Sequence, residues 1–343
     1  MFSALLRRRR RPVLVLAAVL AALVAATAVL AFGGSADVVV YNGRSQYGDE
    51  QSFKNFEKET GKTLLLRGGT APELFERLES EGSDTPADLL VTTDLANLWR
   101  AKQAGLLQPV SSKALEQQVP QEYRDPDGDW WGMSLRIRTP MRSTERVSED
   151  AIKRYEDLGK PRFKGRLCLR TSNNEYNQSL VADMLAKRGP DATEKLLRGW
   201  MANEPQILGS DVDVLEAIDA GRCDVGLTNH YYLGRILKDD PDFPVAPAWP
   251  DQGGAGAHTN LSGVGLVKGS EHRADSIKLL EVLTAPADQG LITENSEFAV
   301  NPEVGPAAHL KAWENVKRDP IDVAEAGKRL PEAVKLMQQV GWQ

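Results

Sequence analysis

Two adjacent tyrosines, Tyr231 and Tyr232, follow a short strand-like segment, CDVGL at residues 223–227. This segment predicts a β-strand that ends near Asn229, which places the tyrosine pair at the carboxyl end of a strand. Open α/β sheets bind ligands at these strand ends. Two neighbouring phenol oxygens could coordinate a hard cation or stack against an organic ring. An isolated tyrosine pair is more often a packing feature with wet hydroxyl groups, so the other tyrosines decide between these interpretations.

Two further tyrosines, Tyr47 and Tyr176, are also predicted to follow strands. Tyr47 belongs to the first half of the predicted fold, and Tyr176 lies with the tyrosine pair in the second half. The four phenols are therefore expected to face one another across a cleft. Ionised phenol oxygens suit Fe(III), whereas zinc favours Cys or His and calcium favours carboxylates and carbonyls. A free phenol has a pKa of about 10, but binding to a trivalent cation favours its ionised form.

One histidine of the four, His230, adjoins the tyrosine pair. A histidine in this place could bind a metal directly. Alternation along a strand would point its side chain away from Tyr231, so we expect it to be a structural or supporting residue.

The first 36 residues predict an export signal. Arginines 7–11 form a basic run that includes a twin-arginine pair, and the uncharged apolar stretch 13–32 follows it. Cleavage is expected after Ala31 or Ala36, and the chain is then periplasmic. The stretch of 20 residues is also long enough to span a bilayer, so retention as a membrane anchor is the alternative.

Composition narrows the possible partners. Loss of the five signal arginines changes the formal net charge from −6 to −11, which argues against nucleic acid as a partner. The two cysteines, Cys168 and Cys223, could form one disulfide in an exported chain, and two separate buried thiols are the alternative.

Strand-length apolar runs alternate with helix-length segments along the rest of the chain. The predicted strands of the first half lie at 37–41, 63–66 and 88–92, with helices at 53–61, 71–81 and 94–103. The second half adds a strand at 164–169 and helices at 179–188, 192–201 and 212–220, and the last part adds helices at 276–283, 285–294, 322–328 and 331–340. This alternation predicts an α/β fold with parallel strands covered by helices on both faces.

Two extended segments, 130–139 and 258–268, are predicted to join two lobes, each with a central sheet. The second lobe is inserted into the first, and such hinged lobes close on a ligand. The predicted division is an export signal at 1–36, lobe 1 at 37–133 and 258–310, the inserted lobe 2 at 134–257, and a C-terminal helical segment at 311–343 that packs on lobe 2.

Three segments are more specific than this general pattern. They are YNGRSQY at 41–47, CLRTSNNEYNQSL at 168–180 and CDVGLTNHYY at 223–232. Together with looser support at 131–138 and 295–300, they resemble the periplasmic ferric-ion-binding proteins of ABC importers, within the wider group of periplasmic substrate-binding proteins. The resemblance covers essentially the whole chain after the signal.

The resemblance implies a two-lobed periplasmic-binding-protein fold and no enzymatic activity. It implies a monomer that delivers ferric ion to an ABC permease in the inner membrane. It also implies that the Fe(III) ligands are Tyr47, Tyr176, Tyr231 and Tyr232.

One position departs from the family. Many relatives carry a histidine immediately before the tyrosine of the first lobe, and this chain has Gln46 there. A neutral amide is a poor Fe(III) ligand, so water or a small anion such as carbonate is expected to complete the coordination. Ser172 and Asn174 could donate hydrogen bonds to this anion, and turn formation is their alternative role.

Four arginines could face the anion or balance the phenolates. They are Arg44, Arg136, Arg138 and Arg170, and solvated or interlobe ion pairs are their alternative role. Arg138 is singled out by resemblance to the anion-contacting arginine of relatives, and Arg44 by its proximity to Tyr47.

Two other functions compete with a ferric site. An organic solute such as thiamine, a polyamine or a phosphonate would stack on the tyrosines and on Trp130 or Trp131. A hydrolase is not expected, because the chain has no Gly-x-Ser-x-Gly or His-Glu-x-x-His motif. The carboxylate pairs 211/213 and 127/129 precede a helix or lie in a turn, where capping and solvation explain them.

Overall fold

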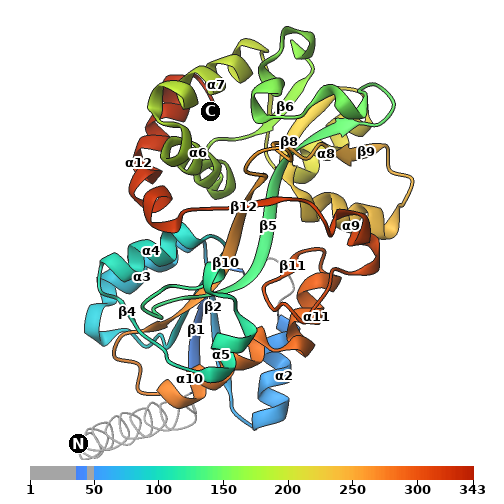
Figure 1. Ribbon diagram of the computed structural model, residues 1–343. Helices are drawn as coiled ribbons and strands as arrows, with labels where there is room; N and C mark the ends of the chain where they lie inside the picture. Colours follow the sequence, from blue (N-terminus) through green and yellow to red (C-terminus); the bar gives the residue numbers. More distant parts are fainter. Residues whose placement is uncertain (1–35, 45–49) are drawn as a thin grey trace, which may run out of the picture. The chain divides into compact units, whose positions relative to one another are not determined.

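A computed structural model describes residues 36–44 and 50–343 as a mixed α/β fold (Figure 1). Its main strands follow the order β2-β1-β3-β10-β5-β8-β6-β7. Residues 1–35 of the predicted export signal, together with Gln46 and Tyr47, lie outside the described residues. Among the described residues, no helix combines the length and the apolarity that a membrane crossing requires.

Lobe 1 is built around β1 (Val38–Asn42), which is buried along its whole length. Continuous burial is typical of a parallel strand covered on both faces, and β1 pairs in parallel with both of its neighbours. The further strands of this lobe are β2 (Leu64–Gly68), β3 (Leu89–Thr92), β4 (Leu107–Gln108) and β11 (Phe298–Ala299). Its helices are α2 (Glu50–Thr60), α3 (Ala71–Glu81), α4 (Leu95–Gln103), α5 (Lys113–Gln118), α10 (Arg273–Thr284) and α11 (Pro286–Glu294).

Lobe 2 contains a second group of strands that begins with β6 (Leu167–Arg170), which pairs in parallel with both of its neighbours. The other strands of this lobe are β7 (Gln206–Leu208), β8 (Val225–Asn229) and β9 (Val245–Pro247). Its helices are α6 (Glu175–Arg188), α7 (Pro190–Ala202), α8 (Asp211–Asp219) and α9 (His230–Asp239). In both lobes a strand is thus followed by a helix, as the sequence pattern predicts.

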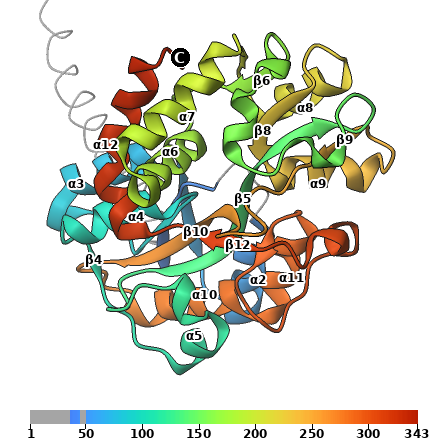
Figure 2. The ribbon, with the colours of Figure 1, turned by 45° about the horizontal axis from the view of Figure 1, so that its top comes forward.

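Two long strands cross between the lobes, in the places predicted for the extended segments. β5 (Trp131–Ser143) pairs with β10 (Ala257–Val267) up to Ile137, and from Arg138 onward it pairs with β8. A third segment, β12 (Arg318–Pro320), pairs with the first residues of β10 (Figure 2). We propose that the lobes meet at this exchange of partners, close to the boundary predicted from the sequence.

A disulfide joins Cys168 in β6 to Cys223, which precedes β8, and both residues are fully buried. The bond links two neighbouring strands of lobe 2 across a sequence separation of 55 residues. Among the described residues no free cysteine remains.

The predicted pair of C-terminal helices is wrong, because the structure has one helix, α12 (Val323–Gln339), with Pro331 in its interior. An interior proline has no N–H to donate to the carbonyl four residues earlier and costs about 3 kcal/mol. Buried residues on both sides, among them Ala326 and Leu336, offset this cost and hold the helix together. α12 packs on α6 and also on α4.

A buried polar group joins α6 to the crossing strands. Asp183 of α6 pairs with His258 of β10 at 2.8 Å and with Lys187 at 3.1 Å. Lys187 also pairs with Asp319 of β12 at 2.9 Å. Burial alone would raise the pKa of Asp183, but the charges of His258 and Lys187 lower it below its ordinary value of 3.8.

We expect Asp183→Asn to lower the free energy of unfolding by about 2 kcal/mol at pH 7, because charge-assisted hydrogen bonds are lost. An acid whose folded-state pKa is lowered stabilises the fold above its ordinary pKa, and this stability is lost as the pH falls through the folded value. The difference between variant and parent should therefore shrink as the pH falls below 3.8. Urea titrations of both proteins at several pH values measure this difference in stability. A difference that does not change with pH would argue against a stabilising role for the ionised Asp183 carboxylate.

Candidate metal-binding site

Three of the four predicted metal-binding tyrosines begin helices. Tyr176 lies in the first turn of α6, and Tyr231 and Tyr232 lie in the first turn of α9. Each helix begins within a few residues of the preceding strand, so these tyrosines follow strands, as predicted, but lie in helical turns. Helix N-termini carry a partial positive charge, which favours anionic groups such as phenolates.

The three phenols share charged neighbours. The ring centroids of Tyr231 and Tyr232 are 4.3 Å apart. Burial lowers the pKa of Arg136, but Tyr176, Glu297 and Tyr231 together raise it above its ordinary value. Burial likewise lowers the pKa of Arg170, but Asp211, Tyr232 and Tyr176 together raise it above its ordinary value. Tyr176 therefore interacts electrostatically with both arginines, and each arginine also interacts with one residue of the tyrosine pair. The N-termini of α6 and α9 thus lie close to the same two cations.

Arg136 has unused hydrogen-bonding capacity at this place, and among the described residues Nε of Arg170 is also without a partner. Its side chain is buried, and its guanidinium carbon lies 5.2 Å from the ring centroid of Tyr176. Its Nε and Nη2 atoms have no hydrogen-bond partner among the described residues. Buried donors of this kind are costly unless a ligand or water accepts from them.

Arg44 is held inside lobe 1 by a buried ion pair. Its Nη2 atom lies 2.9 Å from Glu297 Oε1, and its Nη1 donates to the hydroxyls of Ser134 and Ser262. Burial would raise the pKa of Glu297, but Arg44, Arg136 and a hydrogen bond from Ser134 lower it to about 2. The ion pair therefore persists at any physiological pH. Sequence reasoning did not identify Glu297, although it lies in the segment 295–300 that supported the family resemblance.

Arg138 has a structural role that differs from the predicted contact with an anion. Its Nε donates to Asn177, Nη1 donates to Asp211 and Asn229, and Nη2 donates to Asp211 and the carbonyl of Leu227. All five N–H groups are thereby used within lobe 2. Asp211, which was considered as an acid–base carboxylate, is the fully buried partner in this ion pair.

His230 packs as a neutral side chain. Its Nδ1 accepts a hydrogen bond from the backbone N–H of Ile137 at 3.1 Å, and its ring stacks on Phe298 at 4.7 Å. Burial lowers its pKa to about 3. These contacts fit the predicted structural role.

Asn174 caps α6 through its side-chain oxygen. Its Oδ1 atom accepts hydrogen bonds from the backbone N–H groups of Tyr176 and Asn177. Ser172 lies in the preceding turn, where its carbonyl accepts a hydrogen bond from Gln178. These contacts are typical of turns and caps, and the donation of hydrogen bonds from the two side chains to an anion stays a prediction.

We expect Asn174→Ala to lower the free energy of unfolding by about 1 kcal/mol, because the first turn of α6 loses its cap. Asn174→Asp keeps an accepting side-chain oxygen and should retain most of the stability. Guanidinium titrations of both variants measure the effect. Equal stability of the alanine variant and the parent would show that the cap contributes nothing.

Two acidic residues meet between the lobes, and sequence reasoning missed both. Thr93, at the end of β3, donates to Oε1 of Glu175 at 2.7 Å, and Glu175 is the residue before Tyr176. The neighbouring Asp94 caps α4 through the backbone N–H groups of Ala96 and Asn97. Burial and the charge of Glu175 raise the pKa of Asp94 to about 6.

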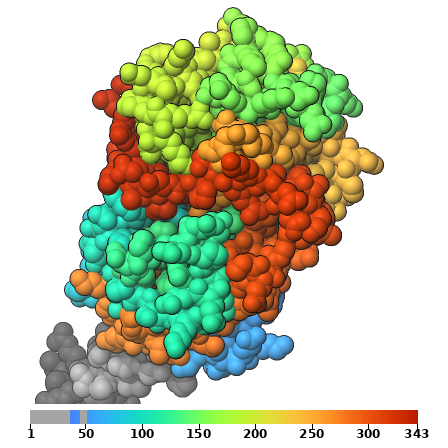
Figure 3. Space-filling model, in the orientation of Figure 1, coloured from blue at the N-terminus to red at the C-terminus, as the bar shows by residue number. Residues whose placement is uncertain are grey.

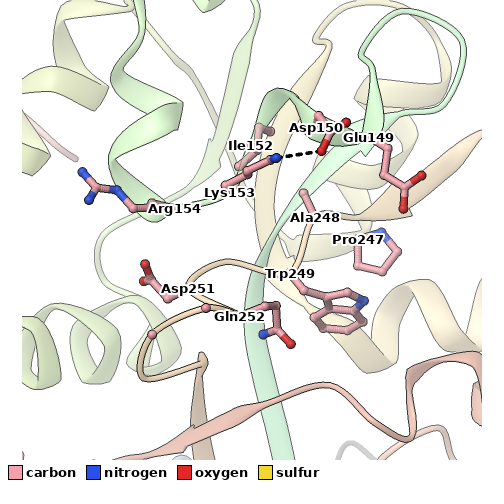
Figure 4. A pocket seen from close by; sticks show the side chains of 12 residues that line it. Glu149, Asp150, Ile152, Lys153, Arg154, Pro247, Ala248, Trp249, Asp251 and Gln252 are labelled. Atoms are coloured by element: carbon pink, nitrogen blue, oxygen red, sulfur yellow. Dashed lines mark ion pairs between the residues drawn. The ribbon is translucent and has the colours of Figure 1, made fainter.

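Other polar clusters do not resemble a second solute site. The carboxylates of Asp125, Asp127 and Asp129 surround the ammonium group of Lys102, which already supplies a positive charge. A cavity of about 620 Å³ in lobe 2 is lined by Trp249 and by the exposed ion pair of Lys153 with Asp150 (Figure 4). None of the predicted site residues lines it.

Comparison with known proteins identifies the family. Residues 84–325 match the family described as bacterial extracellular solute-binding protein. The chain belongs to this family. Its members bind solutes and are not enzymes, so the predictions of a binding protein without enzymatic activity and of the periplasmic-binding-protein fold are confirmed.

Relatives of this solute-binding protein carry names that refer to iron. Iron uptake protein A1 of Synechocystis sp. is 38% identical over 320 residues, which are 90% of this chain and 88% of the relative. The Fe(3+)-binding periplasmic protein of Serratia marcescens is 28% identical, over 92% of this chain and 95% of the relative. A solved structure of Trichodesmium IdiA (FutA) in complex with iron and citrate ligands is 36% identical with a TM-score of 0.82, and it covers 89% of this chain and 99% of its own.

Proposed function

We propose that this solute-binding protein binds Fe(III) in the cleft between its lobes through Tyr47, Tyr176, Tyr231 and Tyr232. The observation that carries the proposal is the convergence of the last three phenols from two helix N-termini. Relatives along nearly the whole chain are named as iron-uptake and Fe(3+)-binding proteins, which supports the same cargo.

The chemistry of the donors favours a trivalent cation. Phenolate oxygens are hard anionic ligands, and the N-termini of α6 and α9 stabilise their negative charge. The buried guanidinium group of Arg136 adds fixed positive charge beside Tyr176. Positive charge near the phenols favours their ionised form, so less free energy is needed to deprotonate them when the metal binds.

We further propose that Arg136, and not Arg138, faces a synergistic anion such as carbonate. The unpaired Nε and Nη2 donors of Arg136 lie beside Tyr176, whereas every donor of Arg138 is used within lobe 2. An anion that accepts from Arg136 would compensate for Gln46, which is a poor ligand. Arg44 would contribute charge through its position but is tied to Glu297.

The stacking of an organic solute has less support. Trp130 and Trp131, which were expected to stack on such a solute, are both buried in the protein core.

The proposal also includes where the protein acts and which partner receives the iron. We propose that the chain is exported, acts in the periplasm as a monomer, and hands Fe(III) to an ABC permease in the inner membrane. The names of the periplasmic relatives and the predicted export signal support this location.

Titration of the metal-free protein tests the cargo. Addition of ferric nitrilotriacetate should produce a visible phenolate-to-iron absorption band that saturates at one equivalent. It should also raise the thermal midpoint, because a ligand that binds only the folded state stabilises it. Thiamine, spermidine and methylphosphonate serve as competitors. A higher thermal midpoint with one of these compounds, together with no visible absorption band with iron, would contradict the proposal.

The role of the anion needs a separate measurement. The same titration in bicarbonate-free buffer, with and without added bicarbonate, should show weaker iron binding without the anion. In Arg136→Met this dependence should disappear, whereas in the parent protein it should be retained. An equal bicarbonate effect in both proteins would assign the anion elsewhere.

A further inference from the structure

The C-terminal helix α12 is anchored on lobe 2. It packs along α6, and after it ends the indole N–H of Trp342 donates to the carbonyl of Arg170 at 2.9 Å. The same indole meets the ring of Trp200 edge to face, with centroids 5.9 Å apart. These contacts fix the end of the chain against strand β6 and helix α7.

The other end of α12 touches lobe 1. Gly327, in the first half of the helix, lies directly against the indole of Trp99 on α4. A Cβ atom at position 327 would lie 2.4 Å from Cε3 of Trp99, whereas ordinary contacts begin at 3.4 Å. The glycine therefore lets the two helices lie about 1 Å closer together than a residue with a Cβ atom would allow.

Pro331 lies between the two contacts. Because it has no N–H, the carbonyl of Gly327 receives no helical hydrogen bond from the residue four positions later. The first half of α12 is thus joined to the anchored half by a weakened turn. Figure 3 shows the C-terminal segment as a continuous band of atoms between the two lobes on the face in view.

The contact of α12 with α4 adjoins the helix that carries Tyr176. A cavity of about 700 Å³ is lined by Asp94 and Trp99 from lobe 1, Glu175 from lobe 2, and Gly327 from α12. The hydrogen bond from Thr93 to Glu175 joins the lobes at the same place. The spacing between α12 and α4 therefore also affects the distance between lobe 1 and the start of α6.

We propose that the Gly327–Trp99 contact is a positioning contact that sets how closely lobe 1 approaches lobe 2. Its effect on iron retention rests on the proposed function, but its effect on lobe spacing does not. A side chain at position 327 pushes α4 away from α12, which is fixed to lobe 2. The lobes then separate at the cleft, and the tyrosines of the second lobe lose their alignment with the first.

The test uses Gly327→Ala in the mature protein with one spin label on each lobe, at Glu116→Cys on α5 and Lys195→Cys on α7. Both residues are exposed, and the native cysteines are paired in the disulfide. Electron–electron distance measurements on the metal-free and the ferric-loaded protein should show a longer or broader distance in the variant. Release of Fe(III) to a chelator should be about 2- to 30-fold faster, in line with couplings measured for other remote contacts.

Two further variants separate the contact from general helix effects. Gly290 lies in the interior of α11, and a Cβ atom there meets nothing within 4 Å among the described residues. Gly290→Ala should leave the lobe distance and the release rate unchanged. Removal of the indole in Trp99→Ala should cancel most of the effect of Gly327→Ala in the double variant, because the two residues are in contact.

Each outcome decides the proposal. Restored lobe spacing in the double variant supports it, and an unchanged distance in Gly327→Ala overturns it. An equal effect of Gly327→Ala with and without Trp99 also overturns it. If the parent binds no iron, the proposed function fails, while the distances in the metal-free protein still test the positioning contact. A thermal melt of every variant confirms that it is folded.

Discussion

The double variant Tyr231→Phe with Tyr232→Phe is expected to lose the visible iron band and to bind Fe(III) at least about 100-fold more weakly than the parent. Changes that only support a metal ligand already cost about 10- to 100-fold in affinity, so loss of two ligands should cost at least as much. The fold should persist, because phenylalanine keeps the ring contact between the two positions and removes only the hydroxyl groups. Chelator competition measures the affinity, and circular dichroism checks the fold.

A matched control is available at Tyr123, whose hydroxyl lies beside Glu122 and Arg318 rather than among the candidate ligands. Tyr123→Phe should leave the iron band unchanged. Full colour in the double variant would remove the tyrosine pair from the coordination sphere. Loss of colour in the control as well would indicate a general effect on folding.

The substitution Arg138→Met is expected to cause a large loss in the free energy of unfolding. The substitution leaves Asp211, which is fully buried, without its closest cation, and removal of one partner from a buried ion pair costs about 3–5 kcal/mol. The carbonyl of Leu227 and the amide oxygens of Asn177 and Asn229 lose hydrogen bonds at the same time. The free energy of unfolding from urea titration should fall accordingly.

The double variant Arg138→Met with Asp211→Leu separates charge from packing. In Arg138→Met the buried carboxylate of Asp211 keeps only its longer ion pair with Arg170 at 3.5 Å. Because an apolar pair of similar volume removes this poorly compensated charge, the double variant should recover part of the lost stability. A double variant that is less stable than both single variants would show that the ion pair is not the main contribution of Arg138.

Much of the fold follows from local patterns in the sequence. The alternation of apolar strands and amphipathic helices predicts the elements that carry the site, because burial on both faces requires continuous apolar runs such as 38–41. The prediction failed at Pro331, where the helix continues through a residue that normally starts or ends one. Packing on α6 and α4 outweighs the local cost of the proline, and no local pattern reports such long-range packing.

The candidate site was only partly predictable for the same reason. Tyrosines after strands can be recognised from their spacing, but the roles of the arginines depend on partners that are distant in the chain. Arg138 finds Asp211, 73 residues away, and Arg44 finds Glu297, 253 residues away. Arg136 keeps unpaired donors. The three cations look alike in the sequence, and only the fold separates them.

The bond between Cys168 and Cys223 ties together the strands that lead into α6 and α9, and these helices present the clustered phenols. Such bonds form in oxidising compartments and are rare where thiols are kept reduced. Before oxidation, main-chain pairing and the shared apolar core would hold β6 beside β8. The redox state of the surroundings therefore bears on how firmly these two strands, and the helix starts that follow them, are held together.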